Sequence, residues 1–189
     1  MPFDFNCAMH ELMVDVAAVC DELRHVDMSQ VAVGFSQARH GRLDGVYATI
    51  QPLRFPGGTR TNTTPRGATW QMPRVVVNGR EVLYVVTYRL PRFLLLGFEE
   101  KLETVVHEMY HISPAFDGTL RLFEGKKRYH TGSKNRYNEV MRQIGLRYLK
   151  ATSRPELHEF LRLDFAELKA AHGGLVGTKF RGLNPRRIA

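Results

Sequence analysis

The segment His107-Glu108-Met109-Tyr110-His111 contains residue types that could bind a metal ion and activate water. Two histidines at i and i+4 lie on one face of a helix, so both imidazoles can reach one ion. Zinc accepts neutral imidazole nitrogen, and a catalytic zinc keeps one position open for water. Glu108 can take the proton of that water. The motif predicts a zinc-dependent hydrolase with His107 and His111 as metal ligands and Glu108 as catalytic base.

A third ligand is expected after the motif, and two residues are candidates. Asp117 falls on the last position of the extended H-E-x-x-H-x-x-G-x-x-H spacing, in which Pro114 replaces the glycine. His130 offers imidazole, the commoner ligand. Asp117 could instead orient a ligand histidine, or it could simply be a turn residue before Gly118. We predict His130 as the third zinc ligand and Asp117 as the orienting residue.

A helix from about Phe98 to Ile112 must position these side chains. Glu100, Thr104, His107 and His111 recur on one face, and an apolar stripe occupies another, so one face is expected in the core and the other in a cleft. Pro114 cannot continue the helix. The apolar stripe consists of Phe98, Leu102, Val105, Val106, Met109 and Ile112.

The preceding half of the chain predicts one helix and a small sheet. Apolar residues at helical spacing indicate a helix from Phe5 to about Val26, with Asp4 as its cap. Strands are expected at Val31–Phe35 and Val46–Phe55, the latter interrupted or ended by Pro52. The Gly- and Pro-rich stretch Phe55–Met72 is expected to be a loop. Asn78-Gly79 predicts a hairpin between Arg74–Val77 and Glu81–Tyr88.

The remainder predicts helices at Lys134–Leu149 and Pro155–Ala171, ended by Gly173-Gly174. Residues 173–189 are expected to be an irregular basic tail. Together the elements predict one α+β domain over residues 1–189: an N-terminal helix, a small mostly antiparallel sheet, the H-E-x-x-H helix and C-terminal helices.

Lys and Arg number 27 against 19 Asp and Glu, a net charge of +8. The excess gathers in 121–136 and 179–187, which favours acidic partners. An ordinary solvated surface is preferred to a nucleic-acid site there, because no motif that stacks bases is recognisable. Charged residues near the N-terminus argue against a signal peptide, and no apolar run could span a membrane. Cys7 and Cys20, 13 residues apart, cannot bridge on one helix. A cytoplasmic protein is expected.

The segment Leu102–Gly132 resembles a family of metallopeptidases found in bacteria and their phages. The resemblance implies a compact zincin-like domain, a zinc cofactor and peptidase activity, with a peptide or protein as substrate. It extends over most of residues 30–150. The matching stretches are Thr104–Pro114, Phe116-Asp117-Gly118, Leu120-Arg121, His130, Gly45–Ala48, Pro52–Phe55, Asn78-Gly79-Arg80 and Leu90–Phe93.

Peptide-bond hydrolysis by metal-activated water is the favoured function. Arg121, Tyr129 and Tyr137 are candidates by position for stabilising the oxyanion. The strand Glu81–Tyr88 could bind an extended peptide at its edge. Two alternatives remain: a non-proteolytic zinc protein whose basic surface binds nucleic acid or a phage or host protein, and a hydrolase of non-peptide amides.

Overall fold

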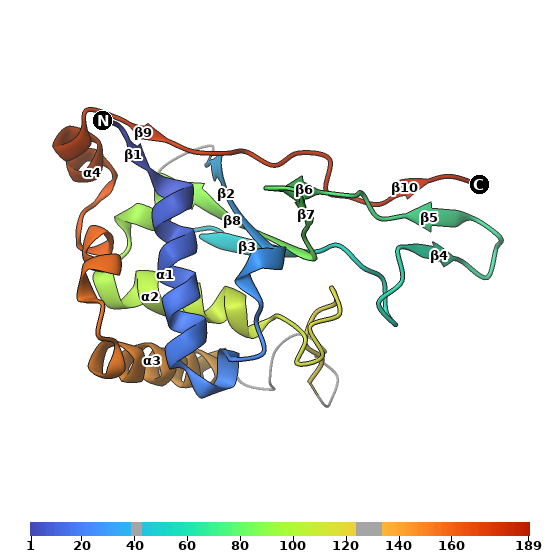
Figure 1. Cartoon of the computed structure of the whole chain (residues 1–189), viewed down its shortest axis with the longest axis horizontal. Coiled ribbons are helices and arrows are strands. Elements are labelled where there is room, and N and C mark those ends of the chain that lie inside the picture. Colours follow the sequence, from blue (N-terminus) through green and yellow to red (C-terminus); the bar gives the residue numbers. More distant parts are fainter. Residues whose placement is uncertain (39–42, 124–133) are drawn as a thin grey trace.

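The computed structural model describes residues 1–38, 43–123 and 134–189, and a mixed three-stranded sheet lies at its centre (Figure 1). The strands run in the order β2 (Val31–Gln37), β8 (Tyr84–Leu90), β3 (Ala48–Pro52). Strand β8 pairs parallel with β2 and antiparallel with β3. Both edges of β8 are therefore occupied, and the hypothesis that Glu81–Tyr88 binds a peptide at its edge is wrong. Strand β3 forms the edge of this sheet that lies beside the motif helix.

Strand β8 is buried on both of its faces. Tyr84, Val86 and Tyr88 belong to the main hydrophobic core, whereas Val85 belongs to a smaller cluster with Ala32 and Leu53. Successive side chains of a strand point to opposite faces, so the two clusters lie on the two sides of the sheet. A nearly continuous apolar run is the sequence pattern that such a doubly covered strand needs.

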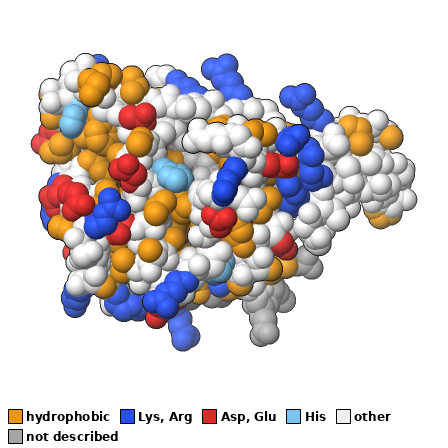
Figure 2. Space-filling view, in the orientation of Figure 1, with side chains coloured by type: hydrophobic (Ala, Val, Ile, Leu, Met, Phe, Trp, Pro, Cys, Tyr) orange, Lys and Arg blue, Asp and Glu red, His pale blue; other side chains and the backbone are white. Residues whose placement is uncertain are grey.

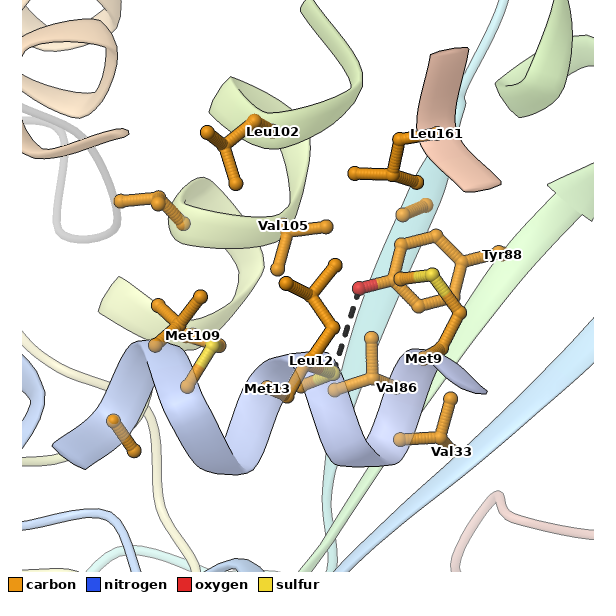
Figure 3. Packing of buried hydrophobic residues seen from close by; sticks show 14 of the residues in the cluster. Met9, Leu12, Met13, Val33, Val86, Tyr88, Leu102, Val105, Met109 and Leu161 are labelled. Carbon is orange, nitrogen blue, oxygen red and sulfur yellow. Dashed lines mark hydrogen bonds between the residues drawn. The ribbon is translucent and has the colours of Figure 1, made fainter. Parts of the chain in front are cut away.

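Helix α1 (Phe5–Val19) covers the main-core face of the sheet. Asp4 caps it as predicted, its carboxylate accepting the amide N–H of Cys7 at 3.0 Å. The helix ends at Val19 rather than Val26, and a short 3₁₀ turn (Asp21–Leu23) follows. Figure 3 shows Leu12 and Met13 of this helix beside Val105 and Met109 of the motif helix, and the hydroxyl of Tyr88 donating to the sulfur of Met13 at 3.6 Å.

The motif helix α2 (Phe98–Tyr110) has the predicted position, and α3 (Lys134–Ala151) packs along it. The predicted helix Pro155–Ala171 is wrong as a continuous element. It is divided into 3₁₀ turns (Pro155–Leu157, Glu159–Arg162) and α4 (Phe165–His172). Asp164 accepts the amide N–H of Glu167 at 2.8 Å, so its side chain starts a new helix there.

A buried cation of α2 binds backbone carbonyls of this segment near the point where it is divided. Lys101 is 2% exposed. Its Nζ donates to the carbonyls of Leu161 and Leu163, at 2.9 and 2.8 Å. A continuous helix would have used such carbonyls internally. Burial lowers the pKa of Lys101, while Asp164 and Glu167 oppose that effect. The lysine therefore links α2 to the C-terminal segment.

The stretch Phe55–Met72, predicted to be a loop, contains a hairpin of β4 (Thr61–Thr63) and β5 (Thr69–Gln71). Its threonines are β-branched and favour strands, a preference that the Gly and Pro content concealed. The predicted irregular tail likewise contains β9 (Leu175–Val176) and β10 (Arg186–Arg187). Strand β9 pairs with β1 (Phe3–Asp4), and β10 pairs with β5.

The hairpin at Asn78-Gly79 is confirmed. Both residues have positive φ, 50° and 77°, as a type I′ turn requires. The paired strands, β6 (Val76–Val77) and β7 (Arg80–Glu81), are short, because the chain then leaves the hairpin to form β8.

Two composition-based expectations can be compared with the fold. Cys7 and Cys20 are both free thiols, the first exposed and the second buried just after α1. Among residues 1–38, 43–123 and 134–189, the helices are too short or too polar to traverse a lipid bilayer.

His158 generates a prediction about acid stability. Its side chain is 4% exposed, with its ring near those of Phe98 and Tyr148. Burial, helped by Arg162, lowers the pKa of His158 against the opposing charge of Glu159. Below the unfolded-state pKa of about 6.5 the unfolded chain then binds more protons than the native one, so stability falls as pH decreases.

We expect the free energy of unfolding of metal-free protein to fall between pH 7.5 and 5.5, and to fall less in His158→Phe. Urea titrations at several pH values measure this difference. The exposed His172 supplies the matched control, His172→Phe. Equal pH dependence of His158→Phe and the unchanged protein would contradict the prediction.

Candidate metal centre

Helix α2 begins at a defined cap that sets its register. The carboxylate of Glu100 accepts the amide N–H of Gly97 at 2.9 Å, and Glu99 and Glu100 lie in the first turn, where negative charge suits the helix dipole. Leu102, Val105 and Met109 are buried in the main core. Because these side chains must face inward, residues 104, 107 and 111 face the other side, as the sequence predicted.

The two motif histidines converge at one point. Their Nε2 atoms lie 3.0 Å apart. Two nitrogens bound to one tetrahedral zinc at about 2.05 Å would be about 3.3 Å apart. His111 is 7% exposed and follows directly after α2, and its carbonyl accepts the amide N–H of Arg121 at 2.7 Å. The distance of 3.0 Å between the two nitrogens is therefore close to the separation that two imidazole ligands of one zinc ion need.

Glu108 lines the same cleft as the two histidines and Ile50 of the edge strand. Its side chain is 8% exposed. Burial raises the pKa of Glu108 to about 7, and a hydrogen bond from the backbone amide of Ile50 partly opposes that rise. A carboxylate in this environment is a candidate proton acceptor, because it is largely shielded from water and no cation of the described residues forms an ion pair with it.

Strand β3 directs the backbone groups of alternate residues away from β8 and toward this helix. Arg89 donates to the carbonyl of Tyr47, and Leu53 donates to that of Leu83, so the odd-numbered residues bond to β8. In an antiparallel pair the alternate residues direct their backbone groups outward. Ala48 and Ile50 are those residues in β3, which agrees with the bond from Ile50 to Glu108.

A cleft of about 670 Å³ separates the edge strand from the helix. One wall is formed by residues 45–50 and the other by α2, with further contributions from Leu96, Leu120 and Asn138. The cleft residues of α2 and its C-cap are Glu100, Glu103, Thr104, His107, Glu108 and His111. The histidines and Glu108 are thus accessible to a ligand of peptide size along one continuous wall.

Tyr137, from the first turns of α3, contacts both imidazoles. Its ring is stacked on His111, with centroids 6.0 Å apart, and meets His107 edge-on at 5.0 Å. Burial, together with nearby Tyr110 and Glu108, raises the pKa of Tyr137. Of the three residues predicted by position to stabilise an oxyanion, Tyr137 is the one that the described structure brings to the histidines.

Arg121 is engaged elsewhere. Its Nε donates to the carbonyl of Tyr110 at 2.7 Å, and its guanidinium lies 4.1 Å from the centre of the Tyr110 ring. Within the described part of the chain, Arg121 is not among the residues that line the cleft. Arg121 instead contacts Tyr110, the last residue of α2. Tyr129 lies outside the described residues.

Asp117 shapes the turn that follows α2. Its Oδ1 accepts the amide of Thr119 at 3.1 Å and the hydroxyl of Thr119 at 2.7 Å. Burial raises the pKa of Asp117, but hydrogen bonds from Thr119 and Ser113 outweigh it, and the net shift is downward. Among the described cleft-lining residues Asp117 is absent. The turn closes with a bridge between Ile112 and Leu120, which carries the chain back past His111.

The third ligand stays a prediction. His130, predicted to be that ligand, lies outside the described residues. In the ranges 1–38, 43–123 and 134–189, no three His, Cys, Asp or Glu side chains are grouped so that they could hold a metal ion. Of the three predicted zinc ligands, the described part of the chain therefore contains His107 and His111.

Sequence reasoning missed the backbone of Ala48 and Ile50 and the side chain of Asn138 as parts of the cleft. One signal was present: Pro52 confines its strand to a sheet edge, because proline cannot donate to a ladder. No pattern indicated that this edge would face α2. Comparisons with protein-family models, curated proteins and solved structures gave no match.

Metal affinity tests the convergence of the imidazoles. We expect the protein to bind one zinc ion, and His107→Ala and His111→Ala each to weaken binding by at least the roughly 10- to 100-fold that loss of a supporting group costs. Competition with a chromophoric chelator measures this affinity. His172→Ala, at an exposed site, should bind zinc normally. Unchanged zinc affinity in either motif variant would refute the assignment.

Proposed function

We propose that this protein is a zinc-dependent peptidase with a zincin-like fold. The observation that carries the proposal is the juxtaposition of three features in one cleft: Nε2 atoms of His107 and His111 that lie 3.0 Å apart, the buried carboxylate of Glu108, and the outward-facing edge of β3. The resemblance of residues 102–132 to phage and bacterial metallopeptidases supports the same function.

His107 and His111 would hold the zinc, with His130 as the proposed third ligand. When bound, zinc supplies Lewis-acid chemistry that lowers the pKa of water toward about 7 and polarises a carbonyl. Glu108 accepts the proton of the attacking water and then delivers it to the leaving amine. Its place beside both imidazoles and next to the strand suits both transfers. Tyr137, packed against both histidine rings, is positioned to orient them.

The edge of β3 favours a peptide over other amides as substrate. Ala48 directs its N–H and C=O toward the cleft, and Ile50 directs its C=O there, while Ile50 N–H is bonded to Glu108. An extended peptide backbone can complete these groups by adding a strand. We therefore assign peptide binding to β3 rather than to Glu81–Tyr88, because β3 is the strand whose outer edge lines the cleft.

Glu108→Gln tests the catalytic role directly. The amide keeps the size of the side chain but cannot accept the proton, so cleavage of a peptide library should fall by roughly 10²- to 10⁴-fold. Zinc affinity should change little, because Glu108 is not a ligand. Mass spectrometry of a zinc-loaded digest measures the cleavage, and His172→Ala serves as active control. Equal cleavage by Glu108→Gln and the unchanged protein would leave a non-proteolytic zinc protein as the better account.

Ala48→Pro tests the edge strand as a peptide-binding element. Proline removes the outward N–H, a position that an edge strand tolerates. One lost hydrogen bond of about 1 kcal/mol corresponds to a roughly five-fold lower kcat/KM for peptides. Ala48→Gly retains the N–H and is the matched control. A small amide too short to reach β3 should be hydrolysed equally by both variants. Equal kcat/KM for peptides in Ala48→Pro and Ala48→Gly would contradict the model.

A further inference from the structure

A second feature of the molecule lies outside the cleft. Strands β4, β5 and β10 form a small antiparallel sheet in the order β10-β5-β4, which extends from the body along its longest axis (Figure 1). We call this sheet, with residues 55–74 and 177–189 that build and join it, the arm. The amide of Thr69 donates to the carbonyl of Ala189, and the amide of Ile188 donates to that of Thr69, both at 2.8 Å. These bonds tie together segments more than 100 residues apart.

The arm carries almost the whole net charge of the chain. Its two segments contain seven Lys and Arg and no Asp or Glu, which leaves 20 basic and 19 acidic residues elsewhere. Six of the seven cations are exposed. Figure 2 shows Lys and Arg gathered where the arm leaves the body, with no acidic side chain on the visible part of the arm beyond them. The seven are Arg60, Arg66, Arg74, Lys179, Arg181, Arg186 and Arg187.

One carboxylate at the base of the arm does not neutralise it. Glu81 accepts from Arg54 at 2.8 Å and from Arg74 at 3.1 Å, and Arg60 lies 3.9 Å away. Three guanidinium groups therefore surround a single carboxylate, and the local charge stays positive. Burial raises the pKa of Glu81. The hydrogen bond from Arg54 and the positive charges of Arg54, Arg60 and Arg74 outweigh burial, so the pKa lies below its ordinary value.

The register divides the arm into two polar faces. On one face, Gln71 has Thr61 on one side and Arg186 on the other. The same face carries Thr63 and Thr69, whose hydroxyl oxygens lie 3.0 Å apart. The other face carries Asn62, Trp70 and Arg187 in one row. Hydroxyl, amide and guanidinium groups are those that contact phosphates. An aromatic ring beside arginine is the arrangement on which bases stack.

We propose that the arm is a nucleic-acid-binding surface that contacts the phosphate backbone. A membrane-binding element would need apolar anchors beside its cations, and Ile188 is the single large hydrophobic residue of the described arm that is exposed. Nucleic acid therefore fits this surface better than a lipid headgroup layer.

The test uses the full protein carrying Glu108→Gln, with EDTA present, so that its result is independent of the metal centre. Binding of a fluorescein-labelled 20-base-pair DNA duplex is followed by anisotropy from 50 to 300 mM NaCl. If most of the seven cations each neutralise a phosphate, log K should fall against log salt with a slope of about −4 to −6. Trp70 is the only tryptophan, so its emission reports binding at the arm.

The key variant replaces Arg66, Arg181, Arg186 and Arg187 with Gln. It should bind the duplex at least about tenfold more weakly at 150 mM NaCl, with a slope shallower by about 3 to 4. Replacing the same four with Lys keeps the charge and should retain binding. The matched control has the same change of net charge on the body, through Gln at exposed Arg24, Lys150, Arg154 and Lys169. It should bind within about twofold of the parent.

Four outcomes would overturn the proposal. They are no duplex binding at 50 mM NaCl, equal losses in the arm and body variants, equal affinity for polyglutamate of matched charge, and preferential binding of phosphatidylglycerol vesicles. Circular dichroism and thermal melting of all variants establish that the arm is folded. If the Lys variant binds and the Gln variant does not, while both are folded, the charge of the arm is responsible.

Discussion

Helix α2 has to bury an apolar stripe on one side while keeping two imidazoles together on the other, and much of the structure follows from that constraint. Leu102, Val105 and Met109 enter the core between α1, the central sheet and α3. The buried ammonium of Lys101 adds a polar requirement, which the carbonyls of Leu161 and Leu163 satisfy. With that side of the helix immobilised, little rotation about its axis is available. The separation of 3.0 Å between the two Nε2 atoms is then a consequence of packing.

The same packing sets the environment of Glu108. The helix lies against the edge strand closely enough for the amide of Ile50 to donate to this carboxylate, and closely enough to exclude most water from it. Burial without a cationic partner raises the pKa of a carboxyl group. The cleft therefore brings together a buried carboxylate, two imidazole nitrogens 3.0 Å apart and the outward-facing backbone groups of β3. Each of these follows from a different local rule of helix or sheet geometry.

The arm follows a different principle from the rest of the molecule. The body buries apolar surface around α2, whereas the arm has short strands of threonine, glutamine and arginine held together mainly by backbone hydrogen bonds. Small sheets of this kind have little hydrophobic stabilisation of their own. Their position on the long axis of the molecule, and their concentration of positive charge, separate the proposed polyanion surface from the proposed peptidase cleft.

The sequence alone determined features governed by neighbours along the chain. Periodicity placed α2 and its two faces, Asp4 marked the start of α1, and Asn78-Gly79 marked a turn with two positive φ angles. Prediction from the sequence failed where contacts between distant segments of the chain decide the structure. Thr61–Thr63 and Thr69–Gln71 form strands that a third strand, 115 or more residues further along the chain, completes. The strand β8 could not be recognised as central, since both its partners come from elsewhere in the chain. Only tertiary structure turned the edge of β3 toward Glu108 and brought Tyr137 to the histidines, because helical and strand periodicities specify which side chains share a face but not what that face meets.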